Sequence, residues 1–149
     1  MPDLKFEKNA GGIVAGIDEV GRGPWAGPVV AAAVIIDQNK VSLCLSNTID
    51  DSKRLSLTRR EEIAANLSSC AKIGIGAATP HEIEKLNILG ATLKAMERAV
   101  NALPVKPDFA LVDGNRMPAL PCPGQTIVKG DSISLSIAAA SIIAKVTRD

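Results

Sequence analysis

The chain has 149 residues, of which 46% are hydrophobic and 22% charged, and its 17 basic and 16 acidic residues leave a formal net charge of +1. This length and composition fit one globular domain with a sizeable core. The near-neutral charge does not indicate a strongly basic nucleic-acid-binding domain, so any such contact has to come from local clusters. No apolar run approaches the roughly 18 to 20 residues of a membrane span, and the N-terminus lacks a signal-peptide layout. We therefore expect a cytoplasmic protein without membrane contact.

Several kinds of site have little support in the composition. The cysteines Cys44, Cys70 and Cys122 lie far apart without CxxC spacing, and His81 is the single histidine. Neither pattern suggests a zinc site, and no arrangement of serine, cysteine and histidine suggests nucleophilic catalysis. Aromatic residues make up 2% of the chain and there is no tyrosine, which weakens the case for base stacking.

The first half of the chain predicts a hairpin, a helix and a strand. Two apolar, partly β-branched runs at 12–19 and 28–37 flank a turn rich in Gly and Pro at 20–27, which predicts a β-hairpin. The polar segment 38–56 is irregular. Thr58 then lies three residues before Glu61, a capping-box pattern that predicts a short helix. Residues 71–79 are predicted to form a strand.

The second half begins with a predicted long helix, for which Thr79, Pro80 and Glu82 supply the N-cap, the first-turn proline and the capping-box acid. Its apolar positions recur at helical spacing and predict a face that meets the core: Ile83, Leu86, Leu93, Met96 and Val100. "DFALVDG" and "QTIVKGD" predict two short strands, and "SISLSIAAASIIAKVTR" predicts a closing helix rich in small residues. This order predicts an α/β domain whose mixed central sheet, with an N-terminal antiparallel hairpin, is covered by helices.

Carboxylates lie at the ends of three predicted strands. Asp18 and Glu19 follow "GIVAGI", Asp113 follows "FALV", and Asp131 follows "TIVKG". Ligand sites of α/β sheets gather just outside strand ends, so these acids are candidates for one pocket. Such a cluster needs a countercharge, and an all-oxygen ligand set favours Mg²⁺ or Mn²⁺ over zinc. Two such ions support phosphoryl transfer, which points to a hydrolytic nuclease.

Each acid also has a structural interpretation. Asp131 alone fits a helix N-cap, Asp113 a turn residue, and Asp18 with Glu19 a solvated strand end. Consecutive strand residues point to opposite faces, so Asp18 and Glu19 do not both reach one ion from a regular strand. Either the strand twists or bulges there, or Glu19 reaches a second ion or offers its backbone carbonyl. The joint placement of all four acids favours the site.

The glycine-rich turn "GRGPWAG" is not a dinucleotide fingerprint, because its spacing differs and a strand follows it. It is either a plain hairpin turn or a turn in which Gly21 and Gly23 let the backbone approach a ligand, with Arg22 as a cation for phosphate. Other basic residues, among them Lys145 and Arg148, are interpreted as solvated surface charges.

Five stretches together match one family in its order: "GIDEVGRGPWAGPVVAAAVI", "DDSKRLS", "LNILGATLKAM", "ALVDGNR" and "VKGDSISLSIAAASIIAKVTRD". With these motifs the chain resembles ribonuclease HII, the type 2 RNase H of bacteria. The resemblance implies an RNase H-like fold and a monomeric endonuclease that uses Mn²⁺ or Mg²⁺ and no organic cofactor. It implies hydrolysis of the RNA strand of RNA–DNA hybrids. It also implies incision 5′ of single ribonucleotides embedded in duplex DNA, as in ribonucleotide excision repair, which leaves 5′-phosphate and 3′-hydroxyl ends.

The resemblance also assigns roles to particular residues. The positions that match the catalytic, metal-binding acids are Asp18, Glu19, Asp113 and Asp131. The positions that match the motif contacting the ribose 2′-hydroxyl are Gly21, Arg22 and Gly23. Lys53, in the DSK motif, falls where the family contacts phosphate near the cut.

The chain departs from the family at its C-terminal end. Members of the family continue past the equivalent of Asp149 into helices that include a tyrosine near the junction sugar, and this chain has no tyrosine. We expect a single type-2 RNase H domain over residues 1–149 that is C-terminally truncated relative to the family, with reduced activity. The alternative is a non-catalytic or impaired nucleic-acid- or cation-binding module.

Overall fold

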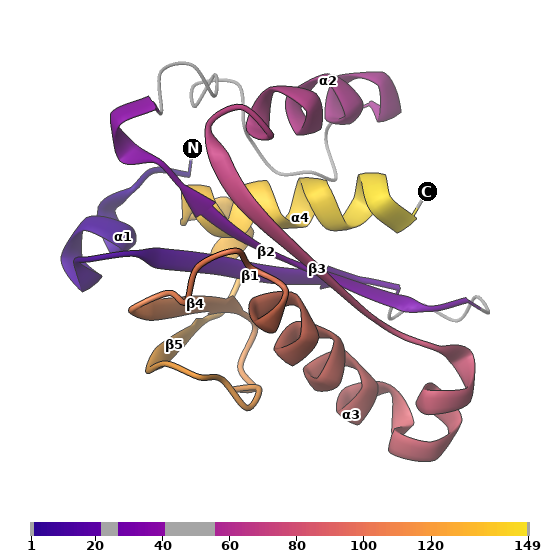
Figure 1. The fold of residues 1–149 in the computed structure, drawn as a ribbon. Coiled ribbons are helices and arrows are strands. Elements are labelled where there is room, and N and C mark those ends of the chain that lie inside the picture. The colour runs from indigo at the N-terminus through magenta and orange to yellow at the C-terminus, as the bar shows by residue number, and fades with distance from the viewer. Residues whose placement is uncertain (1, 22–26, 41–55, 149) are drawn as a thin grey trace.

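The computed structural model describes residues 2–21, 27–40 and 56–148, and within them a five-stranded mixed sheet with the strand order β3-β2-β1-β4-β5 (Figure 1). The first three strands pair antiparallel, and the last two continue the sheet parallel to β1. The strands are β1 (Val14–Val20), β2 (Val29–Ile36), β3 (Ala71–Ala78), β4 (Phe109–Asp113) and β5 (Gly124–Ile127). The predicted hairpin and the mixed α/β architecture are confirmed.

Helices cover both faces of the sheet (Figure 1). The long α3 (Pro80–Asn101) packs on one face, and α2 (Leu57–Leu67) and α4 (Leu135–Arg148) pack on the other. Every residue of β2 is buried, because alternate side chains enter the two cores. The short α1 (Lys5–Ala10) lies near the start of the chain, and the 3₁₀ helix η4 (Gly130–Ser132) precedes α4.

Two glycines let the helices lie directly on the strands. A Cβ atom on Gly16 of β1 would lie 2.2 Å from the carbonyl carbon of Ser136 in α4, and one on Gly76 of β3 would lie 2.3 Å from the carbonyl oxygen of Ala95 in α3. No larger residue fits at either position without moving the helix. The helices are thereby held close to the sheet, and α4 lies against the strand that carries Asp18.

The start of α2 differs from the sequence prediction. Ser56 is the N-cap, and its side-chain oxygen accepts a hydrogen bond from the backbone N–H of Arg59 at 3.1 Å. The predicted capping box at Thr58 and Glu61 is therefore wrong, because Thr58 already lies within the helix. Ser56 offers the same hydroxyl chemistry two residues earlier.

The predicted capping box of α3 is confirmed, since Thr79 and Glu82 exchange two hydrogen bonds of 3.1 Å. The helix is not continuous, however. Asn87 has non-helical dihedrals (φ 60°, ψ 175°), and its side chain accepts a hydrogen bond from the N–H of Gly90 at 2.9 Å, so the helix restarts there. The restart changes the helical phase, and Leu86 remains 41% exposed instead of meeting the core as predicted.

Among the described residues, no helix combines the length and apolar character needed to cross a membrane.

Candidate functional site

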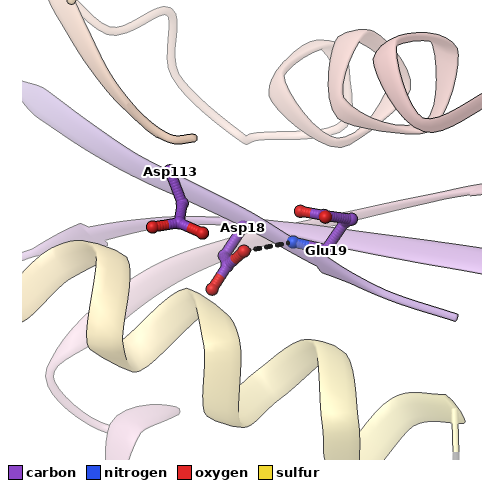
Figure 2. Close-up of side chains that lie close together, drawn as sticks. All are labelled: Asp18, Glu19 and Asp113. Carbon is purple, nitrogen blue, oxygen red and sulfur yellow. Dashed lines mark hydrogen bonds between the residues drawn. The ribbon is translucent and has the colours of Figure 1, made fainter. Parts of the chain in front are cut away.

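Three of the predicted acids lie together at one edge of the sheet. Asp18 and Glu19 are at the end of β1, and Asp113 is the last residue of β4, the parallel neighbour of β1. The register pairs Ile17 with Val112, which brings the next residues, Asp18 and Asp113, side by side. The three side chains each offer an oxygen, and these oxygens all lie within 4.8 Å of one another (Figure 2).

The two adjacent acids lie on opposite faces of β1, as strand geometry requires. Asp18 is buried and points toward α4 (Figure 2). Glu19 lines a cavity together with residues of α3. Asp18 Oδ1 accepts a hydrogen bond from the backbone N–H of Glu19 at 2.8 Å. The pairing of β1 with β4 ends at Ile17 and Val112, and beyond it both carboxylates reach the same edge beside Asp113, so three ligand oxygens meet despite the alternation.

Electrostatics make this group of carboxylates costly without a cation. Burial raises the pKa of Asp18 well above its usual value, and the charges of Asp113 and Glu19 raise it further. Burial also raises the pKa of Asp113, an effect partly offset by hydrogen bonds from the backbone N–H groups of Gly130 and Asp131. A divalent cation would relieve both costs, and the three carboxylates fit the all-oxygen ligand set of Mg²⁺ or Mn²⁺.

Asp131 lies beside this group in a different way from that predicted. The strand β5 ends at Ile127, and Asp131 lies in η4, so the prediction that it ends a strand is wrong. Asp131 is not the N-cap of α4 either. The helix starts at Leu135, and the hydroxyl of Ser134 accepts a hydrogen bond from the backbone N–H of Ile137 at 3.3 Å. The backbone N–H of Asp131 hydrogen bonds to Asp113, but its side chain is not one of the three that converge.

The residue before Asp131 has a role that the sequence analysis missed. The backbone N–H of Gly130 donates a hydrogen bond to Asp113 Oδ1 at 2.7 Å. A Cβ atom on Gly130 would lie 2.6 Å from Cδ1 of Ile137, so glycine allows the close packing that aims this N–H at Asp113. Lys129 produces the turn with a left-handed backbone (φ 55°). The only signal in the sequence was the KGD stretch itself.

A cavity of about 310 Å³ adjoins the acids. Its walls include Glu19 and Asp113, residues 114–116 from the loop after β4, and the apolar side of α3. A larger cavity of about 710 Å³ lies at the opposite end of β1, around Val14. The smaller cavity is the one next to the carboxylates.

Comparison with known proteins shows the family of the chain. The sequence pattern described as ribonuclease HII matches residues 15–149. The chain is 56% identical to "Ribonuclease HII" of Rhodospirillum rubrum, covering 100% of this chain and 69% of that protein. The chain belongs to the ribonuclease HII family. It is also 58% identical to the family member of Paramagnetospirillum magneticum, covering 100% of this chain and 74% of that protein.

Solved structures of the family share the fold. The crystal structure of the ribonuclease H2 from Pyrococcus horikoshii OT3 matches with a TM-score of 0.79 at 30% identity, covering 91% of this chain and 72% of that one. The RNase H-like architecture expected from the sequence is thus confirmed.

Of the other predicted site residues, the described part of the chain includes Gly21. Gly21 follows β1 with a left-handed backbone (φ 104°), whereas Arg22, Gly23 and Lys53 lie outside the described residues. Arg148, which the sequence analysis interpreted as a solvated charge, donates a hydrogen bond from Nε to the carbonyl oxygen of Pro28 at 3.0 Å. This contact joins positions 120 residues apart, and no local sequence pattern indicates it.

Proposed function

We propose that this protein is a metal-dependent endoribonuclease. It hydrolyses the RNA strand of RNA–DNA hybrids and incises duplex DNA 5′ of single embedded ribonucleotides, leaving 5′-phosphate and 3′-hydroxyl ends. The observation that carries the proposal is the convergence of Asp18, Glu19 and Asp113 at the ends of adjacent parallel strands, in a chain of the ribonuclease HII family. The proposed unit is a single type-2 RNase H domain over residues 1–149.

The carboxylates would hold Mg²⁺ or Mn²⁺, which when bound supplies an activated water and stabilises charge on the phosphate. Asp18, Glu19 and Asp113 provide the ligand oxygens, and Asp131 is proposed as the fourth acid from its place next to Asp113. The N–H of Gly130 fixes the orientation of the Asp113 carboxylate. The two faces reached by Asp18 and Glu19 would let the acids serve more than one ion.

Substrate recognition is proposed at the turn after β1. Gly21, Arg22 and Gly23 would meet the ribose 2′-hydroxyl, the group that distinguishes RNA from DNA. Gly21 supports this role because its positive φ favours glycine at this turn, two residues after Glu19. Lys53 is proposed to contact a phosphate near the cut. The cavity between Glu19 and α3 lies beside the acids on the side opposite Asp18.

The test is cleavage of a labelled DNA duplex that contains one ribonucleotide, with Mg²⁺ or Mn²⁺ present. We expect a cut 5′ of the ribonucleotide and a loss of at least roughly 100-fold in Asp113→Asn, because a metal ligand is removed. Asp37→Asn is the matched control, since Asp37 is exposed and follows β2 at the other end of the sheet. An uncut duplex with both metals, or unchanged cleavage by Asp113→Asn, would contradict the proposal.

A second candidate function is a non-catalytic module that binds nucleic acid or a divalent cation. It is supported by the convergence of Asp18, Glu19 and Asp113, an arrangement that suits a divalent cation whether or not a substrate is cleaved. Metal-stabilised folding and hybrid binding without turnover would support it. Single-turnover cleavage that disappears in the acid variants would exclude it.

A further inference from the structure

The C-terminal end of α4 is tied to the hairpin that carries Asp18 and Glu19. The Nε–H of Arg148 donates a hydrogen bond to the carbonyl oxygen of Pro28 at 3.0 Å. The pairing of β1 with β2 ends at Val20 and Val30, and that of β2 with β3 ends at Val29, so Pro28 is the first residue outside the sheet. The arginine therefore restrains a part of the hairpin that the sheet does not hold.

Two glycines leave room for the arginine. A Cβ atom on Gly21 would lie 2.8 Å from Arg148 Nε, and one on Gly27 would lie 3.0 Å from Arg148 Nη2. Both glycines also have positive φ angles, 104° and 139°. The guanidinium thus packs against both ends of the turn, in space that side chains would fill. Among the described residues, the hydrogen-bond partner of Arg148 is the carbonyl oxygen of Pro28.

The other end of α4 is fixed against the same strand. Gly16 of β1 lies so close to Ser136 that no side chain fits between them. The helix therefore has a fixed place on β1. Its last residue, Arg148, lies against Gly21, which is two residues after Glu19. Glycine loses much conformational entropy on ordering, so a contact at Gly21 and Gly27 reduces the cost of holding these two positions when substrate binds.

We propose that Arg148 is a positioning residue that holds the Gly21 end of the hairpin turn in place for substrate binding. This inference rests on the proposed function, in which Gly21 meets the ribose. Arg148 acts through Pro28 and the two glycines, so charge alone does not perform the task. A lysine would keep the charge but lacks the planar guanidinium and its Nε–H.

The kinetic test compares Arg148→Ala and Arg148→Lys on the single-ribonucleotide duplex. We expect both variants to raise KM about tenfold, the size expected from losing one hydrogen bond to a charged group, with kcat changed less than about twofold. Lys145→Ala is the matched control, because it removes a positive charge from the last turn of the same helix. A wild-type KM in Arg148→Lys, or an equal rise in Lys145→Ala, would show that charge alone matters and overturn the inference.

A second measurement does not depend on cleavage. We expect the amide hydrogens of Gly21 and Gly27 to exchange about tenfold faster in both Arg148 variants, while those of Val14–Ile17 in β1 stay unchanged. Unchanged exchange at both glycines would overturn the positioning role even if KM rises. If the wild-type protein cleaves nothing, the proposed function fails, but the exchange experiment still decides whether Arg148 fixes the turn.

Discussion

At the scale of single residues, Asp18 carries the largest electrostatic cost of the site. It is 5% exposed, and its pKa is raised by burial and by the charges of Asp113 and Glu19. An acid with a raised pKa in the folded state binds more protons than in the unfolded state. The unfolding free energy of the metal-free protein therefore falls as the pH rises above the ordinary carboxyl range.

Asp18→Asn should stabilise the metal-free protein. The amide removes the buried charge and keeps an oxygen that accepts the N–H of Glu19. In chelator at neutral pH we expect a melting temperature about 3 °C or more above wild type, since 1 kcal/mol corresponds to a few degrees in a domain of this size. The variant should also lose part of the pH dependence above the ordinary carboxyl range.

A bound metal ion should reverse the order of the melting temperatures of wild type and Asp18→Asn. Mg²⁺ or Mn²⁺ should raise the melting temperature of the wild type by binding the folded state, and raise that of Asp18→Asn much less. Asp37→Asn, at an exposed position, should behave like wild type in both conditions. A melting temperature of Asp18→Asn below wild type in chelator would contradict the electrostatic account.

The residues of the site differ in how far sequence could place them. Asp18, Glu19 and Asp113 were placed at strand ends because apolar runs before them identify β1 and β4. Asp131 was misplaced, because the left-handed turn at Lys129 follows the end of β5 and no residue preference marks it. Arg148 was missed, because its partner Pro28 is 120 residues away. Local patterns thus predict local placement, and contacts between distant segments escape them.

At the scale of elements, α3 is two helical segments held together by Arg98. Its guanidinium reaches both carboxylate oxygens of Glu82, at 2.8 and 2.6 Å, and the carbonyl oxygen of Ala77 in β3 at 2.8 Å. The contact joins the segment before Asn87 to the segment after it and to the sheet. The capping box could be predicted from the sequence, whereas the contact between Glu82 and Arg98, 16 residues apart, could not.

Glu82→Gln should weaken the link in a pH-dependent way. The hydrogen bond from Arg98 is the main cause that lowers the pKa of Glu82 from 4.5 to about 2. A lowered pKa contributes stability that is present above the ordinary value and is lost as the pH falls toward the folded-state value. We expect Glu82→Gln to have a lower urea midpoint than wild type at pH 7, and a flatter loss of stability between pH 4.5 and about 2.

The control for this experiment is Glu84→Gln, two residues away on the exposed side of the same segment. It should leave both the urea midpoint and its pH dependence close to wild type. Equal behaviour of the two variants would mean that the contact with Arg98 adds no stability.

At the scale of the whole molecule, the sheet combines a local part with a long-range part. The hairpin of β1 and β2 follows from adjacent apolar runs, so sequence predicted it. The parallel pairing of β1 with β4 joins Val14 to Phe109 and depends on segments that sequence does not connect. That pairing is what brings Asp113 to Asp18. The prediction of the site therefore rested on a general rule about strand ends, not on a derived strand order.

A second long-range link ties the N-terminal segment to the region after Asp131. Glu7 of α1 is 2% exposed, and its Oε2 accepts hydrogen bonds from the hydroxyls of Ser134 and Ser136, at 2.8 and 2.6 Å, and from the N–H of Ser136 at 2.8 Å. The backbone of Asp3 bonds to Ile133 and Leu135 on either side of Ser134. The start of α4 is therefore held by residues from the beginning of the chain.

Glu7→Ala should destabilise the whole domain, because it leaves buried hydroxyl and N–H donors at Ser134 and Ser136 without their acceptor. We expect a loss of about 2–4 kcal/mol in the unfolding free energy measured with urea, in one cooperative transition. Glu7→Gln, which keeps one acceptor oxygen, should lose less, and Lys8→Ala at the exposed neighbouring position should stay within about 0.5 kcal/mol of wild type. If Glu7→Ala unfolds like Lys8→Ala, the link does not stabilise the fold. A separate early transition would show instead that α1 detaches without unfolding the sheet.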